Sequence, residues 1–262
     1  MRFIRVVVSA GLLALLYRRM DWAQARSVLA GLRMELIPVL FLVLLVNSLL
    51  SAWKWKMILA ADGIRLGLWS LLRTYLIGSF MNLFLPSTVG GDAYRIVTLA
   101  RHAGGAGRSA ASVLADRLTG FIALSLLALV FGTLQMSVLP SRWIILLPLA
   151  ATGGFLLAGW AALRPRIFLR LLPGGAPLRS KMEGFLEKLQ GAMISYRETH
   201  GLYLRIFAMS FAFQTLVVAL VNLMLLAMGC RVYPTSLLAV VPMISLVEAL
   251  PLSVFGLGLR AA

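Results

Sequence analysis

The chain has 262 residues, of which 61% are hydrophobic and 13% charged, and its formal net charge is +16. A soluble domain carries about 25% charged and roughly 45–50% apolar residues, so this composition excludes an ordinary soluble enzyme and a disordered chain. It indicates an all-α, polytopic membrane protein. In such a protein the excess of Lys and Arg belongs to cytoplasmic loops and to contacts with anionic lipids, so we expect no nucleic-acid partner.

Five stretches of 18 to 25 residues contain no Asp, Glu, Lys or Arg. A helix that crosses a hydrocarbon core of ~30 Å needs about 20 mostly apolar residues, so several of these stretches are predicted to span a membrane. About seven hydrophobic segments are predicted in all, at residues 2–17, 36–53, 68–85, 109–133, 143–163, 206–228 and 236–255.

The ends of the first two spans carry further signals. Residues 2–17 begin like a signal peptide, but no small-x-small cleavage site follows, so we predict a short first membrane helix. Residues 18–35 have apolar positions at helical spacing and predict an amphipathic surface helix. The second span closes with Trp53-Lys54-Trp55-Lys56, which is predicted to be an aromatic and cationic anchor at the membrane interface.

The main basic segment is residues 164–200, which hold seven Lys or Arg against three Glu. This largest basic cluster predicts a cytoplasmic loop, and its apolar positions predict an interfacial helix within it. Counting spans backwards from this loop leaves two solutions for the N-terminus. If residues 68–85 cross fully, the N-terminus lies outside; if they form a re-entrant hairpin, it lies inside, which we favour.

Two segments match each other without gaps: LPSTVGGDAYR at residues 85–95 and LPLSVFGLGLR at residues 250–260. Both contain a proline that stops a helix, a glycine that lets the backbone unwind, and a terminal arginine. Three predicted spans separate the copies, so they enter the membrane from opposite faces, as paired broken helices do in inverted-repeat transporters. We predict a single domain, residues 1–262, with half-repeats at 36–133 and 203–262. Simple Pro/Gly turns at two helix ends are the alternative.

LPSTVGGDAYR, followed by SAASVLADRLTGFIAL and later by EALPLSVFGLGLR, resembles the lysylphosphatidylglycerol synthase transmembrane, or flippase-like, family of bacterial and archaeal membrane proteins. The resemblance covers nearly the whole chain. It implies a multi-span protein of the inner (cytoplasmic) membrane that translocates or handles lipids such as aminoacylated phosphatidylglycerol or polyprenyl-linked sugars. The family's second motif normally continues for about two more spans, so the C-terminal spans are expected to be missing here. No soluble aminoacyl-transferase domain fits in the chain, so synthase activity is not expected.

Charged residues within apolar segments are the candidate site, because a mid-bilayer charge costs about 2.5 to 3.5 kcal/mol. We predict Arg95 and Arg260 as ligands of a headgroup phosphate, which arginine can bind in a bidentate manner. Asp92 shares a helix face with Arg95, although N-capping of its helix is an alternative role. Asp116 is predicted to pair with Arg95 or Arg260, and Arg117 to reach the cytoplasmic interface. A purely structural ion pair is the alternative. The full predicted substrate-binding set is Asn82, Gly90, Gly91, Asp92, Arg95, Asp116, Arg117, Glu248, Gly256, Gly258 and Arg260.

These features predict a flippase-like protein that translocates or binds an anionic phospholipid or lipid-linked headgroup. No catalytic residue, metal or cofactor is predicted, because nucleotide-binding, zinc-protease and nucleophile-elbow motifs are absent and there are only one Cys and two His. The alternative is a membrane-embedded transferase, or its accessory subunit, that acts on polyprenyl-phosphate-linked sugars through a divalent cation on Asp92 and Asp116. A scaffold for a glycosyltransferase is a third hypothesis. The expected partners are membrane lipids, with a homo-oligomer or a separate glycosyltransferase or synthase left open.

Overall fold

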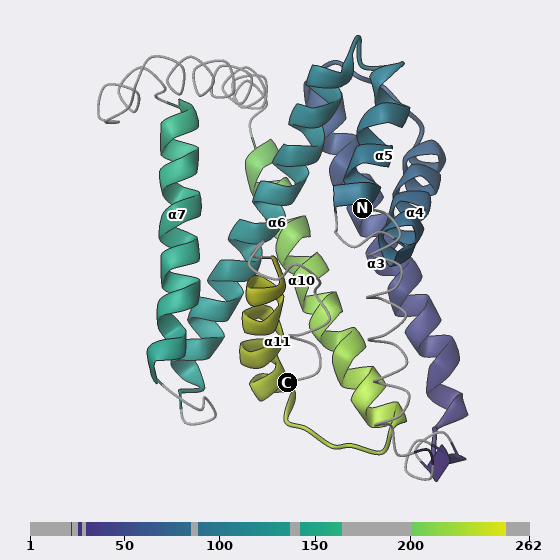
Figure 1. The fold of residues 1–262 in the computed structure, drawn as a ribbon, viewed down its shortest axis with the longest axis vertical. Helices are drawn as coiled ribbons and strands as arrows, with labels where there is room; N and C mark the ends of the chain where they lie inside the picture. The colour runs from purple at the N-terminus through teal and green to yellow at the C-terminus, as the bar shows by residue number, and fades with distance from the viewer. Residues whose placement is uncertain are drawn as a thin grey trace, which may run out of the picture.

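The computed structural model describes residues 22, 26–27, 30–84, 89–136, 142–163 and 201–249, and all structural statements below concern these residues. Within them every regular element is a helix (Figure 1). The predicted helix at residues 2–17, the interfacial helix in 164–200 and the second motif copy lie outside the described residues. The α-helices are α3 (Ile37–Ala61), α4 (Leu68–Phe84), α5 (Val89–Ala100), α6 (Ala106–Leu134), α7 (Leu146–Leu163), α10 (Leu202–Ala227) and α11 (Pro234–Ala249), with short 3-10 helices η1 (Met34–Leu36) and η2 (Arg142–Ile145).

Three helical segments are long and apolar enough to cross a membrane: Met34–Ala61, Ala106–Leu134 and Leu202–Ala227. At 1.5 Å per residue, a helix of 26 residues or more reaches about 39 Å, which exceeds a ~30 Å hydrocarbon core. Two shorter apolar helices accompany them, Trp143–Gly154 and Pro234–Glu248. These findings confirm the predicted all-α membrane fold.

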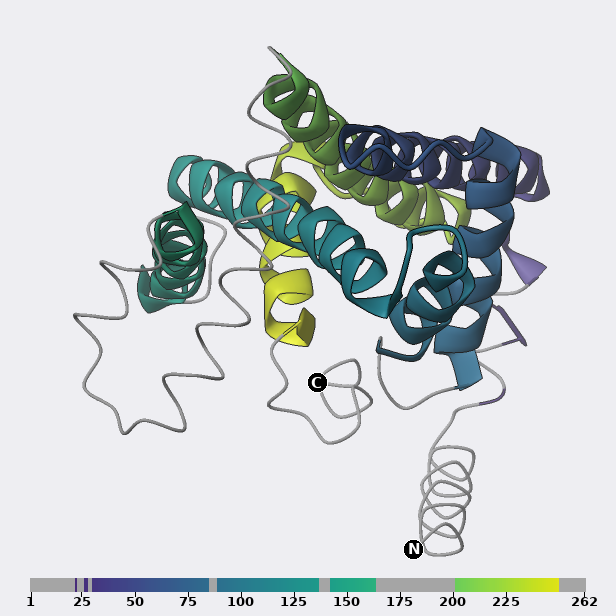
Figure 2. The ribbon, with the colours of Figure 1, turned by 90° about the horizontal axis from the view of Figure 1, so that it is seen from above.

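Helix α6 lies at the centre of the bundle. It packs against α3, α5, α7, α10 and α11, while α7 stands at the edge of the molecule beside one end of α6 (Figure 2). Small hydroxyl residues let the three long helices approach closely, as is usual in membrane bundles. Ser112 on α6 and Ser210 on α10 are fully buried and donate to carbonyl oxygens within their own helices. Their hydroxyl groups are therefore satisfied without water.

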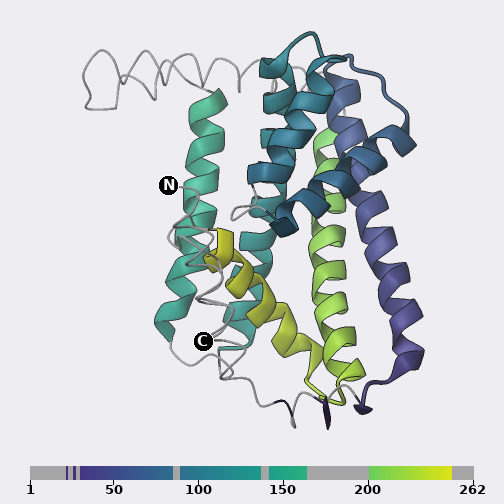
Figure 3. The same cartoon turned by 45° about the vertical axis from the view of Figure 1, so that its right-hand side comes forward.

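Helices α4 and α5 form a re-entrant hairpin. Their outer ends lie at the end of the bundle where α3 stops and α6 starts, and their inner ends, at residues 84 and 89, lie in its middle (Figures 1 and 3). The 12 residues of α5 extend only about 18 Å, too short to cross a bilayer. The hairpin therefore corresponds to the re-entrant alternative for residues 68–85, while the side of the membrane on which the N-terminus lies stays a prediction. Residues 89–100, which lie outside the seven predicted segments, form the helix α5.

Helix α11 enters the bundle from the opposite end. It starts beside the end of α10 and reaches the middle of the molecule at Ala249 (Figure 3). Helices α4 and α11 each precede one copy of the repeated motif, so the two copies are approached from opposite ends of the bundle. The second copy itself lies outside the described residues, so the inverted repeat stays a prediction.

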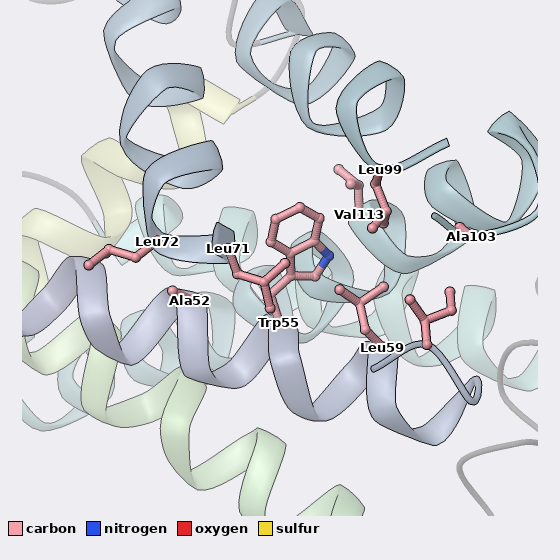
Figure 4. Close-up of a cluster of buried hydrophobic side chains, with 9 residues drawn as sticks. Ala52, Trp55, Leu59, Leu71, Leu72, Leu99, Ala103 and Val113 are labelled. Carbon is pink, nitrogen blue, oxygen red and sulfur yellow. The ribbon is translucent and has the colours of Figure 1, made fainter. Parts of the chain in front are cut away.

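The core between α3, α4, α5 and α6 is built around the indole ring of Trp55, which is fully buried (Figure 4). The predicted interface anchor is therefore wrong for two of its four residues. Trp53 and Lys56 are exposed, but Lys54 and Trp55 point into the bundle. The span does not end at residue 53 as predicted, because α3 continues to Ala61. Successive helical residues differ by about 100° in direction, so neighbours in the motif face different surroundings.

Candidate functional site

A buried ion pair between α3 and α6 forms the base of the site. The ammonium nitrogen Nζ of Lys54 lies 2.9 Å from Oδ1 of Asp116, and the two side chains are 7% and 8% exposed. Nζ also donates to the backbone oxygen of Asp116 at 3.1 Å and to Oγ of Ser210 at 3.3 Å. The ammonium group thus donates one hydrogen bond to α6 and one to α10, while Oδ1 of Asp116 is its ion-pair partner and accepts no hydrogen bond among the described residues. Lys54 therefore ties three long helices together.

Arg95, on α5, carries its guanidinium group to the same carboxylate. Nη2 of Arg95 donates to Oδ2 of Asp116 at 2.8 Å, which confirms the predicted pairing across helices. The guanidinium carbon lies 4.2 Å from the ring centre of Trp55 and 5.4 Å from that of Tyr75, within cation–π range. Nε of Arg95 is buried and has no hydrogen-bond partner among the described residues. Trp55 is itself held by a hydrogen bond from Nε1 to Oγ of Ser112 at 3.3 Å.

Asp92 connects the hairpin to α6 a second time. Arg117 donates to it from Nε at 2.8 Å and from Nη2 at 3.1 Å, while Nη1 of Arg95 lies 3.5 Å from Asp92 on the shared face of α5. The prediction that Arg117 reaches the cytoplasmic interface is wrong. It lies eleven residues into α6, about 17 Å from the helix start, and turns to a carboxylate close by. N-capping by Asp92 is also ruled out, because α5 already begins at Val89.

The five charged side chains line one cavity of about 240 Å³. Three cations and two carboxylates leave the cluster with a formal charge of +1. The cavity is far larger than the ~15 Å³ that one ordered water requires. Among the described residues no further carboxylate lines the cavity. Because an uncompensated charge at bilayer depth is unfavourable, the arrangement favours an additional anion in or beside the cavity. Neutral polar residues complete the wall: Ser51, Tyr75, Ser79, Asn82 and Gln214.

The glycines of the first motif act through packing, and the expected unwinding at Gly90 and Gly91 is not found. Both residues lie within α5. Oδ1 of Asn82, on α4, accepts a hydrogen bond of 2.7 Å from the backbone nitrogen of Gly91, and both residues line the cavity. A side chain on Gly91 would meet the carbonyl oxygen of Gly78, so its absence lets α4 and α5 touch at the tip of the hairpin. Gly90 does not line the cavity.

The remaining predicted site residues belong to the second motif. Glu248 is exposed near the end of α11 and does not line the cavity, so the structure does not bring it together with Asn82. Gly256, Gly258 and Arg260 lie outside the described residues.

Sequence reasoning missed Lys54, Tyr75 and Gln214. The signal that would have found Lys54 is its position seven residues before the end of a 25-residue apolar helix.

The transferase alternative gains no support from this geometry. It needs Asp92 and Asp116 as ligands of a divalent cation, but both carboxylates face arginine or lysine groups at 2.8 to 2.9 Å. In the part of the chain that the structure describes, no three His, Cys, Asp or Glu residues gather as a metal site.

A helical bundle with a re-entrant hairpin and a charged cavity at the hairpin tip defines a polytopic membrane protein whose polar site lies inside the bundle. Residues 2–262 match the family model described as the lysylphosphatidylglycerol synthase TM region, and the chain belongs to this family. No curated protein and no solved structure matches it.

Proposed function

We propose that the chain is a flippase-like protein of the cytoplasmic membrane that binds an anionic phospholipid or lipid-linked headgroup in this cavity and moves it across the bilayer. The observation that carries the proposal is the charge of +1 left by Lys54, Arg95, Arg117, Asp92 and Asp116 around a cavity within the bundle. One monoanionic headgroup would neutralise it. The lipid tails would remain in the bilayer, against the apolar outer faces of the helices.

The two arginines are the residues that would contact the phosphate. Arg117 is 36% exposed and uses only Nε and Nη2 on Asp92, so its Nη1 amino group is available to an anion. Arg95 makes one short hydrogen bond and keeps Nε without an acceptor. Arginine suits this role because its planar group can bind a carboxylate and a phosphate oxygen on different edges.

The distribution of basic residues supports an orientation for the proposal. Helix α7 ends at Leu163 and α10 begins at Leu202 on the side from which the α4–α5 hairpin enters (Figure 1). The segment that joins them, residues 164–200, carries the seven basic residues of the main basic cluster. By the positive-inside bias this side faces the cytoplasm, so the hairpin enters from the cytoplasm and the second motif, with Arg260, would serve the outer side.

Replacing Arg117 with glutamine tests the proposed function. A hydrogen bond to a charged group contributes about 1.5–3 kcal/mol, so we expect the transbilayer movement of phosphatidylglycerol to slow by about tenfold or more. The measurement is the scrambling of a fluorescent phosphatidylglycerol in liposomes reconstituted with the full chain. Arg205→Gln is the matched control, because Arg205 is an exposed cation on α10 outside the cavity, and it should behave as the unmodified chain. Equal rates in liposomes with the unmodified chain, with Arg117→Gln and without protein would contradict the proposal.

A further inference from the structure

Lys54 is held by partners within the bundle. Nζ donates to the backbone oxygen of Asp116 and to Oγ of Ser210 and forms an ion pair with Oδ1 of Asp116, and its side chain is 7% exposed. Yet Lys54 is a cation in the wall of a cavity that we assign to an anion. Its contribution to the site must therefore act through the charge and position of its partners.

Asp116 is the partner that matters, because two cations share its carboxylate. Lys54 holds Oδ1 at 2.9 Å, and Arg95 holds Oδ2 at 2.8 Å. If Arg95 turned from Asp116 to a phosphate in the absence of Lys54, a buried carboxylate would be left without a counter-ion, which is strongly unfavourable. With Lys54 in place, the carboxylate keeps one cation throughout the exchange.

We infer that Lys54 is the fixed counter-ion of Asp116 and a positioning residue that frees Arg95 to exchange this carboxylate for the phosphate of an anionic headgroup. The inference rests on the proposed function of the cavity. The rings of Trp55 and Tyr75 lie 4.2 Å and 5.4 Å from the guanidinium carbon of Arg95. Cation–π contact with both rings would keep the guanidinium group in place while it exchanges one anion for the other. Lys54 thus sets the net charge that the headgroup meets, without contacting the headgroup.

The test compares the full chain with Lys54→Met and with the double variant Lys54→Met/Asp116→Asn. The cluster charge is +1 in the unmodified chain, 0 in Lys54→Met and again +1 in the double variant. We expect Lys54→Met to bind short-chain phosphatidylglycerol about tenfold more weakly or worse, while its binding of short-chain phosphatidylcholine hardly changes. The double variant should recover affinity for phosphatidylglycerol to within about threefold of the unmodified chain. Binding is measured on detergent-purified protein, with thermal unfolding checked for each variant.

The outcomes separate this inference from the proposed function. Lys54→Met with unchanged affinity, or a double variant as weak as Lys54→Met, would overturn the counter-ion role and leave the headgroup site standing. The second result would mean that Lys54 only joins helices. An unmodified chain without preference for phosphatidylglycerol over phosphatidylcholine would overturn the headgroup site and this inference with it. Competition by inorganic phosphate as strong as that by phosphatidylglycerol would assign the cavity to a free anion and overturn the lipid headgroup as ligand.

Discussion

Replacement of Asp116 by asparagine is expected to lower the free energy of unfolding by about 3–5 kcal/mol, the usual effect of removing one partner from a buried ion pair. Among the residues that the structure describes, Asp116 is the one carboxylate that Lys54 contacts and the closer of the two that hold Arg95. Without it, three cations would remain against Asp92 alone, and the formal charge of the cluster would rise to +2. The measurement is thermal or denaturant unfolding of the purified chain in detergent.

Asp92→Asn is the matched control for this prediction. It removes the same charge from the same cluster, but Asp92 is 20% exposed and its main partner, Arg117, is 36% exposed. Water can therefore replace part of the lost interaction, and we expect a loss of about 1 kcal/mol. An equal loss in the two variants would show that Asp116 is not the buried centre of the cluster. The double variant Lys54→Met/Asp116→Asn should be more stable than Asp116→Asn, because it removes both members of the pair.

The second large effect is expected for Gly91→Ala. The added methyl group would meet the carbonyl oxygen of Gly78 and would lie 2.7 Å and 2.8 Å from Oδ1 and Nδ2 of Asn82. A backbone carbonyl can move only with its helix, so α4 and α5 must separate at the tip of the hairpin. Overpacking of this kind costs about 1–3 kcal/mol or more. We expect lower thermal stability together with slower lipid scrambling, because the displaced tip forms part of the cavity wall.

Gly132→Ala is the control for Gly91→Ala, because an added methyl group there would meet side chains and not the backbone. A methyl group there would meet the terminal methyl of Met243 and would lie 2.9 Å from Cδ1 of Ile145. Both neighbours are the ends of flexible side chains, and methionine adapts readily to a changed cavity shape. Alanine also favours helix by up to about 1 kcal/mol over glycine, so the net change in stability should be close to zero. If the two variants lost the same stability, close backbone approach could not be the role of Gly91.

The limits of most of the long helices that the structure describes could be predicted closely from the sequence. Helix α4 was expected at 68–85 and is found at Leu68–Phe84; α6 was expected at 109–133 and is found at Ala106–Leu134. These limits follow from the length of charge-free sequence, which is a property of the chain alone. The exception is α3, which was expected to stop at residue 53. Its last turns carry Lys54 and Lys56 and look like a membrane boundary unless it is known that Lys54 is buried.

Only part of the candidate site could be predicted, because the sequence shows which charges lie in apolar segments but not where their side chains point. Asp92, Arg95 and Asp116 stood out because charges are rare in apolar segments, and the structure brings these three side chains together. Lys54 was missed because a lysine between two tryptophans also fits an interface. The predicted direction of the Arg117 side chain was wrong. This flexible side chain can reach either the interface or α5, and only the position of Asp92 decides between the two.

The sequence by itself determined that this chain is a helical membrane protein and which of its charges are out of place in a bilayer, since hydrophobic length and charge spacing are read along one dimension. Only the tertiary structure decided that α4 and α5 turn back inside the bundle and that Lys54 joins Asp116. Both depend on which helix faces meet, and that is set by close packing between segments far apart in the chain. Glycine at 91, serine at 112 and serine at 210 permit those contacts without indicating in the sequence which partner each will have.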